Sequence, residues 1–90
     1  MNKPRRKQIQ EVITKLNRLQ EDMEILMEEI ETIMDEECEY RDNMPENLQG
    51  SERYEKAEAA CDALESAKDE LESAKDSIDD VVSSLEEAAE

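Results

Sequence analysis

Apolar residues in the first half of the chain recur at the spacing of one face of a long α-helix. Eight of them follow one another at alternating intervals of three and four: Ile9, Val12, Leu16, Leu19, Met23, Leu26, Ile30 and Ile33. This spacing is the a/d repeat of a coiled coil, in which such side chains meet a neighbouring helix. Ile13, Met27 and Met34 widen the stripe, which favours a helix that touches two neighbours, as in a bundle.

The second half of the chain keeps this period but uses smaller residues. Two sets recur every seven positions, Ala57, Leu64, Leu71, Ile78 and Leu85, and three positions later Ala60, Ala67, Ala74, Val81 and Ala88. Residues 64–70 (LESAKDE) return almost unchanged as residues 71–77 (LESAKDS), so the heptad is duplicated. Because alanine lets two backbones approach closely, we expect the alanine set to face the first helix and the two helices to pack tightly.

A polar segment between the two helices carries the signals of a turn. Asn43 and Pro45 are expected to end the first helix, since proline disfavours helical geometry in the residue before it. Asn43 and Glu46 have the spacing of a capping box. Gly50 can take a positive φ to close the turn, and Ser51 can cap the second helix.

These patterns predict a single all-α domain, a long antiparallel αα-hairpin of the coiled-coil type. It covers residues 1–90, with helices at about 5–41 and about 51–88 joined by a turn at 42–51. A turn of this length connects neighbouring antiparallel helices.

A rod of two helices leaves part of each apolar stripe uncovered, including Ile13, Met27, Met34 and Val82. We therefore predict a homo-oligomer, most simply a dimer of hairpins that forms a four-helix bundle with two-fold symmetry. The residues expected in its core are Ile13, Leu16, Leu19, Met23, Met27, Ile30, Met34, Leu64, Leu71, Ile78, Val82 and Leu85.

Charge divides the chain into a basic tip and an acidic body, with a net charge of −16. Residues 1–20 hold six basic residues and one acidic residue, whereas residues 21–90 hold five basic and 26 acidic residues. Such a body repels nucleic acid and anionic membranes, because binding phosphates requires basic side chains. We therefore predict no direct DNA binding and no membrane binding, and we expect the body to attract cations or the basic surface of a partner protein.

The acidic side chains expected to contact such a partner lie on the first helix and near the end of the second. They are Glu24, Glu28, Glu31, Asp35, Asp79, Asp80, Glu86 and Glu87. Carboxylates one helical turn apart lie about 6 Å from each other, close to the phosphate spacing along a DNA strand. The sharpest form of the hypothesis is therefore a DNA mimic, whose binding weakens steeply as salt rises.

Residues typical of catalysis are sparse in this chain. It contains no histidine, the usual general base at neutral pH and the commonest metal ligand. It also contains no Gly-rich phosphate loop and no serine nucleophile motif. We predict a protein that is not an enzyme and that uses neither a cofactor nor a metal.

Three further features remain open between a functional and an ordinary structural role. Cys38 and Cys61 flank the turn and could face each other as a disulfide, or could be two small residues in a reducing cytosol. The acidic run at 35–39 lies on a helix, which favours a solvated face over a cation site. The basic run from Lys3 to Lys7 could bind a phosphate group or simply be a solubilising terminus.

The turn from Tyr40 to Arg53 resembles a linker found in short acidic helical proteins of bacteriophages and mobile elements. In those proteins an Asn-x-Pro-Glu-x-Leu-Gln-x-Ser-Glu turn joins a Glu-rich helix to an Ala- and Leu-rich heptad helix, and the similarity extends from about Ile9 to Glu87. The resemblance implies a bacterial host cytoplasm and a phage origin, where small acidic proteins often bind and block host machinery. It implies no particular binding residue.

The sequence therefore predicts a cytoplasmic, non-enzymatic module that self-associates and binds a host protein, inhibiting a defence or nucleic-acid-processing system. No apolar run reaches the roughly 20 residues needed to cross a bilayer, and no signal-peptide core follows the basic start. Two alternatives stay open at this point. One is a coiled-coil scaffold whose only task is oligomerisation, and the other is a sponge that binds a nucleotide at the Lys3–Lys7 tip.

Overall fold

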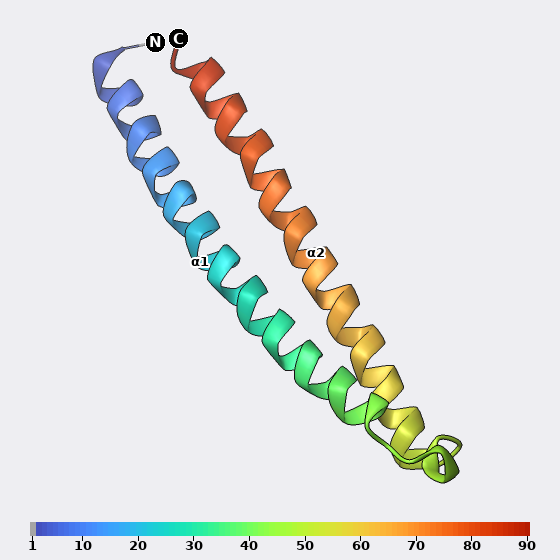
Figure 1. Ribbon diagram of the computed structural model, residues 1–90. Helices are drawn as coiled ribbons and strands as arrows, with labels where there is room; N and C mark the ends of the chain where they lie inside the picture. The colour runs from blue at the N-terminus through green and yellow to red at the C-terminus, as the bar shows by residue number, and fades with distance from the viewer. Residues whose placement is uncertain (1) are drawn as a thin grey trace.

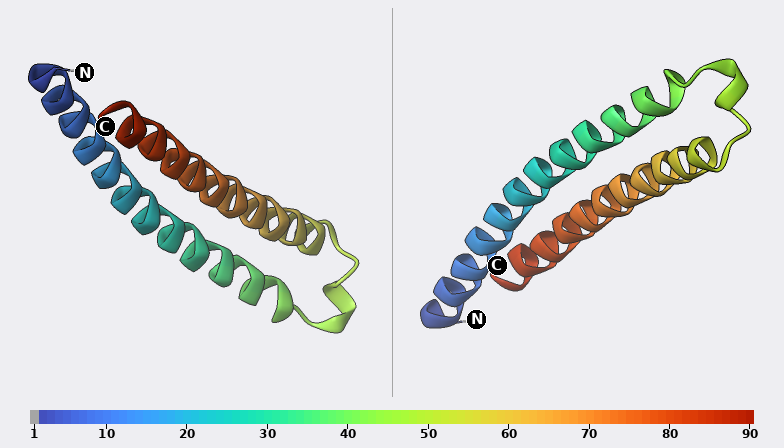
Figure 2. Two further views of the ribbon diagram at one scale, coloured as in Figure 1. Left: turned by 90° about the horizontal axis from the view of Figure 1, so that it is seen from above. Right: turned by 90° about the horizontal axis from the view of Figure 1, so that it is seen from below.

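The chain folds into two long helices that run side by side in opposite directions (Figure 1). The computed structural model describes residues 2–90, with α1 at Lys3–Asp42, a short 3₁₀ helix η1 at Glu46–Leu48 and α2 at Glu52–Ala88. Both chain ends lie at one end of the rod and the turn at the other, as the views in Figure 2 show. The rod measures 70 × 16 × 13 Å. The predicted all-α helical hairpin is confirmed.

Helix α1 begins two residues earlier than predicted because Asn2 supplies a cap. The Asn2 Oδ1 atom accepts a hydrogen bond of 2.9 Å from the backbone N–H of Arg5. Pro4 lies in the first turn, where its missing N–H costs no hydrogen bond. At the other end Asn43 is the C-cap of α1, and its N–H still donates an α-helical hydrogen bond of 2.9 Å to the Glu39 carbonyl.

The turn confirms one predicted cap, corrects another, and corrects the conformation expected at Gly50. Ser51 caps α2, since its Oγ accepts from the backbone N–H of Tyr54 at 3.3 Å. The capping box expected at Asn43 and Glu46 was wrong, because Asn43 is the C-cap of α1 and Pro45 precedes η1 without a side-chain cap. Gly50 does not adopt a positive φ; a short 3₁₀ turn reverses the chain instead.

The contact between the helices uses a different stripe of α1 from the one predicted. Along α1 the buried and half-buried positions before the turn region are Ile9, Ile13, Leu16, Gln20, Met23, Met27, Ile30 and Met34. These are the a and e positions of the heptad, whereas the expected d residues Val12, Leu19, Leu26 and Ile33 are exposed. Ile13 at 5% exposure and Met27 at 9% were expected to remain uncovered by a single hairpin, and that expectation was wrong.

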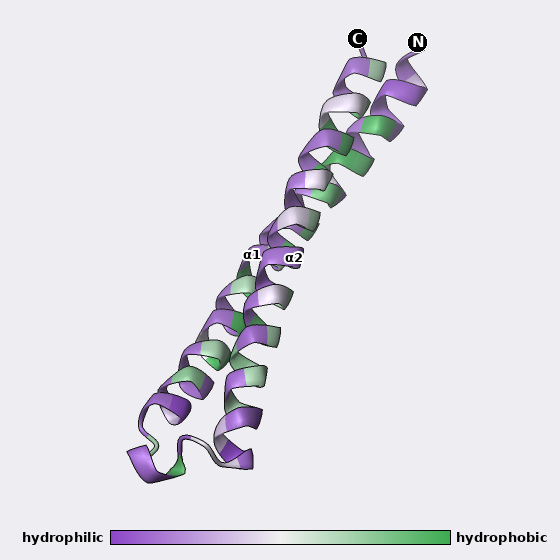
Figure 3. Ribbon diagram, turned by 90° about the vertical axis from the view of Figure 1, so that its right-hand side faces the viewer, coloured by the Kyte–Doolittle hydropathy of each residue, from purple (hydrophilic) through white to green (hydrophobic). Residues whose placement is uncertain are grey.

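Helix α2 departs from the prediction in the corresponding way. Its buried and half-buried positions along the contact are Ala57, Ala60, Cys61, Leu64, Lys68, Leu71, Lys75, Ile78, Val82 and Leu85. The alanine set was expected to face α1, yet Ala67, Ala74 and Ala88 are exposed. The regular alternation of hydrophobic and hydrophilic residues along both helices is visible in Figure 3.

The lysines of α2 give the physical reason for this choice of stripe. Lys68 and Lys75 lay their apolar stems along the contact and extend their charged ends past it. Lys75 Nζ lies 2.7 Å from Glu24 Oε2, and Lys68 Nζ lies 3.4 Å from Glu31 Oε2. The a/e contact brings these opposite charges together.

A polar side chain within the contact also fixes how the helices align. Gln20 Nε2 donates to the carbonyl of Lys75 at 3.1 Å and to Asp79 Oδ1 at 2.6 Å. In Gln20–Asp79, Glu24–Lys75 and Glu31–Lys68 the two residue numbers add up to the same total. One register therefore holds along this length of the rod.

Candidate interaction surface

The expected d residues of α1 form an apolar stripe on the outside of the rod. Its members are spaced seven residues apart and are 45–53% exposed: Val12, Leu19, Leu26, Ile33 and Tyr40. Single exposed apolar side chains are common on soluble proteins, but a continuous row is typical of a surface that meets another molecule.

The alanine set of α2 forms a second stripe next to it. The set consists of Ala60, Ala67, Ala74, Val81 and Ala88. Each helix places two residues of every heptad in the contact between the helices. In both helices the outer stripe stands one residue before the second of these, as Val12 precedes Ile13 and Ala60 precedes Cys61. Because the helices are antiparallel and each residue turns the helix by about 100°, the two stripes lie on the same side of the rod. We call these ten residues together the apolar face.

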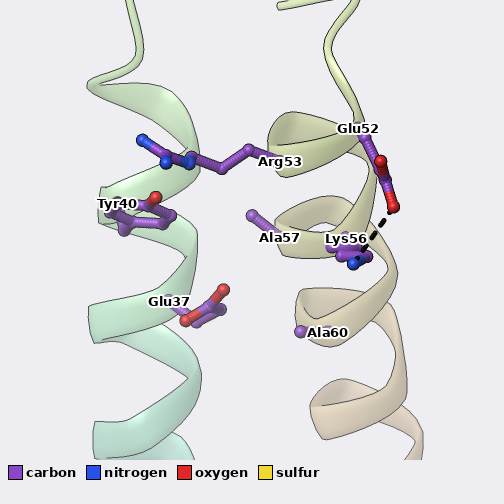
Figure 4. A pocket seen from close by; sticks show the side chains of 7 residues that line it. All are labelled: Glu37, Tyr40, Glu52, Arg53, Lys56, Ala57 and Ala60. Carbon is purple, nitrogen blue, oxygen red and sulfur yellow. Dashed lines mark ion pairs between the residues drawn. The ribbon is translucent and has the colours of Figure 1, made fainter.

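A surface hollow near the turn shows both stripes meeting on that side. The hollow has a volume of about 540 Å³ and is lined by Glu37, Tyr40, Glu52, Arg53, Lys56, Ala57 and Ala60. In Figure 4, Tyr40 projects from α1, Ala57 and Ala60 lie on α2, and Arg53 extends from α2 toward α1. The apolar face thus ends at the turn in an open hollow flanked by charged side chains.

The exposed surface of the hairpin is large for its mass. The described chain exposes 6693 Å², whereas a compact monomer of 10.4 kDa exposes about 5,400 Å². The core is correspondingly thin: the buried apolar residues are Ile13, Met23, Met27, Met44, Ala57 and Cys61. The excess surface is of the size that one side of a protein interface covers.

The eight acidic residues expected to contact a partner fall into two groups. Glu24 and Glu31 are paired with lysines of α2, and Asp79 accepts a hydrogen bond from Gln20. The remaining five are exposed and form no ion pair within residues 2–90: Glu28, Asp35, Asp80, Glu86 and Glu87. The structure does not gather all eight into one site, since they are spread along both helices.

Folding the chain back on itself concentrates the negative charge at one end. We call residues 1–25 and 74–90 the termini half of the rod, and residues 26–73 the turn half, because the cross-helix pairs place residue 25 at the level of residue 74. The termini half holds seven basic and ten acidic residues, a balance of −3. The turn half holds four basic and 17 acidic residues, a balance of −13. The basic residues near the start of the chain are therefore offset by the acidic end of α2, and the turn half carries most of the net charge.

Cys38 and Cys61 lie on facing sides of the two helices near the turn. Cys38 is half-buried and Cys61 is 4% exposed, and both are free thiols. Their residue numbers follow the same register as the cross-helix pairs above. Burial, together with a hydrogen bond to Cys38, raises the pKa of the Cys61 thiol from 9.0 to about 11.

We expect Cys61 to react slowly with iodoacetamide in the folded protein. At about pH 8 its thiolate is about 100-fold rarer than that of a thiol with a pKa of 9.0, and its greater nucleophilicity recovers only about tenfold. The alkylation rate should keep rising with pH until about 11. Mass spectrometry of the Cys61 peptide, with the same chain in concentrated urea as the control, measures this. Equal rates with and without urea would contradict the buried position.

Three further features of the sequence bear on function: the acidic clusters, the basic start of the chain and the length of its apolar stretches. The described residues contain no group of three or more Cys, Asp or Glu side chains arranged to hold a metal ion. The basic tip is tied to the other chain end by a 3.5 Å hydrogen bond from Arg6 Nη2 to the Glu90 carbonyl. Over residues 2–90, neither long helix has an apolar stretch of the length that a bilayer crossing requires.

Comparisons with known proteins add no relative. No protein-family model, curated protein or solved structure matches this chain significantly.

Proposed function

We propose that this chain is a non-enzymatic interaction module that self-associates through its apolar face and presents an acidic surface to a basic region of a partner protein. The observation that carries the proposal is the apolar face, which runs along both helices and which a single hairpin leaves exposed. Large apolar rows on otherwise charged surfaces are typical of protein interfaces.

The area of the rod supports self-association. A side 70 Å long and 16 Å wide offers about 1,100 Å² of projected surface, above the roughly 800 Å² that each partner of a stable complex buries. A dimer of hairpins would place the apolar stripes inside a four-helix bundle and leave the charged sides in water. In such a bundle eleven of the twelve predicted core residues would line the contact within each hairpin, and Leu19 alone would lie between hairpins, together with the other residues of the apolar face.

The charge distribution supports an acidic docking surface. The turn half carries −13. Its exposed carboxylates include Glu28 and Asp35, which stand on α1 four residues after the paired Glu24 and Glu31. A basic cleft that normally holds nucleic acid has the complementary charge, so the partner would be a nucleic-acid-processing or defence protein. The likeness of the turn to bacteriophage proteins suggests a bacterial host cytoplasm as the setting and inhibition as the outcome.

Two measurements on the purified full chain test this proposal. Sedimentation velocity at micromolar concentration should give twice the mass of one chain. Immobilised chain in bacterial lysate at low salt should capture a basic protein, which both added salt and duplex DNA displace. A monomer would refute self-association. If a protein is captured and duplex DNA does not displace it, DNA mimicry is refuted. A dimer that captures nothing would leave an oligomerisation scaffold as the function.

Matched variants separate docking from stability. Glu28→Gln/Asp35→Asn removes two exposed carboxylates that are not paired within residues 2–90 and should weaken capture several-fold. Glu24→Gln/Glu31→Gln removes the same charge from carboxylates already engaged by Lys75 and Lys68, and should weaken capture less. Equal effects of the two variants would show that only net charge matters.

A further inference from the structure

The two stripes of the apolar face share a midpoint. Leu26 is the central residue of the α1 stripe and Ala74 is the central residue of the α2 stripe. The ion pair between Glu24 and Lys75 places these two residues at nearly the same height along the rod. A single two-fold axis at that height can therefore relate each stripe to its own copy.

Two symmetric arrangements cover the apolar face with a second copy of the chain. If the two-fold axis runs along the rod, the turn half of one copy lies over the turn half of the other, and α1 meets the partner's α2. If the axis runs across the rod, the copies point in opposite directions. Each turn half then lies over the partner's termini half, α1 meets α1, and α2 meets α2.

Charge distinguishes these arrangements. With the axis along the rod, a half carrying −13 faces another half carrying −13, whereas with the axis across the rod it faces a half carrying −3. Packed helices are about 8–10 Å apart, which is within about one Debye length at physiological salt, so this repulsion is only partly screened. With the axis along the rod, the large side chains of α1 would pack on the alanines of the partner's α2. In that arrangement, however, the two acidic turn halves repel each other along their whole length.

Small side chains also let the two copies of α2 come together. Beside the alanine stripe, on its outer side, three of four successive heptad positions are small, Ala63, Ser77 and Ser84, and the fourth is Glu70; all four are exposed. Apart from Glu70, the α2 surface on this side therefore has little steric bulk, and two such helices can pack closely. The bulkier α1 stripes would fill the other side of the interface.

We infer that the second copy runs in the opposite direction, so that the turn half of each hairpin is covered by the partner's termini half. This inference rests on the proposed self-association. In this dimer Leu26 meets the partner's Leu26, and Val12 meets the partner's Tyr40. The basic tip from Lys3 to Lys7 lies beside the partner's turn, where Glu46 and Glu52 supply opposite charge.

Spin labels on single cysteines measure the relative direction of the two copies. Glu46→Cys in a Cys38→Ala/Cys61→Ala background places the label in the turn, about 20 residues from the midpoint at Leu26. At 1.5 Å per residue, opposite directions put the two labels about 60 Å apart. The same direction puts them within about 30 Å, the breadth of a bundle. Ile25→Cys labels the middle of α1 and should give the shorter distance in both cases, which makes it the control.

Cross-linking of the native chain gives an independent measurement that needs no substitution. A carbodiimide joins a lysine to a carboxylate in direct contact. In the dimer band we expect Lys3 or Lys7 joined to Glu46 or Glu52, a link that one chain cannot form because these groups lie at opposite ends of a 70 Å rod. Mixing isotope-labelled and unlabelled chains shows that the link is between copies.

The outcomes separate the inference from the proposed function. A turn-to-turn distance near 60 Å and tip-to-turn links support opposite directions. A short turn-to-turn distance, or a cross-linked dimer without tip-to-turn links, overturns the inferred direction and leaves self-association standing. The absence of both a dipolar signal and a cross-linked dimer overturns self-association as well.

Discussion

Leu19→Glu combined with Leu26→Glu is expected to convert the dimer into monomers that keep their helices. Both side chains lie in the α1 stripe and are 47% and 48% exposed, so a single hairpin accommodates glutamate at these positions without burying it. In a four-helix bundle the same carboxylates would be placed at the interface without partners, which costs several kcal/mol. The dimer dissociation constant should rise at least about 100-fold in sedimentation equilibrium.

Ile25→Glu is the matched control for this double variant. Ile25 lies on the same helix and is 54% exposed, but it stands outside the apolar face. It should leave the dimer intact and the helical circular dichroism unchanged. If Ile25→Glu dissociates the dimer as strongly as the double variant does, the interface lies elsewhere on the rod.

Ile13→Ala should cause the largest loss of stability among single substitutions of isoleucine in α1. Ile13 is 5% exposed at the contact between the helices, and truncating a buried isoleucine costs about 2–4 kcal/mol. Ile25→Ala makes the same chemical change at a position that is 54% exposed and should cost less than about 1 kcal/mol. Urea unfolding at matched protein concentration measures both, since the stability of a dimer depends on concentration.

The comparison of these two isoleucines also tests the corrected contact. A contact through a and d positions would bury Val12 rather than Ile13, so Val12→Ala would then be the costlier change. With the observed contact, Val12→Ala should mainly weaken the dimer. If Ile13→Ala and Ile25→Ala lower the free energy of unfolding equally, the assignment of the inner stripe is wrong.

Hydrophobic periodicity predicted the hairpin but left open which side of α1 faces α2. The a, d and e positions of α1 are almost all apolar, so a/d and a/e contacts satisfy the spacing equally well. Between Ile9 and Met34, Gln20 is the one polar residue at these positions, and a polar side chain is ordinarily less suited to burial than an apolar one. In the structure Gln20 is half-buried and bonds to Asp79 and Lys75, which satisfies its polar group.

The inner lysines of α2 were the signal that could have identified the contact. Lys68 and Lys75 repeat at seven residues, as Glu24 and Glu31 do on α1. Pairing these two sets across an antiparallel hairpin requires the a/e contact and places the alanines outside. The apolar face exists because the helices meet through their a and e positions. The sequence prediction assumed an a/d contact, and it therefore placed the alanines on the inside. The cap of α2 was easier to predict, since the hydrogen bond to Ser51 depends only on neighbouring residues.

The cross-helix pairs have a consequence for alignment errors. If α2 slid by one heptad, Lys68 would take the place of Lys75 beside Glu24, and Glu72 would replace Asp79 beside Gln20, so only the pair at Glu31 would be lost. A rod slipped by one heptad would therefore keep two of these three cross-helix pairs. The short connection, anchored by the buried Met44, is what forbids sliding. Proteolytic nicking at the connection would release the rod into several alignments while its helix content stayed the same.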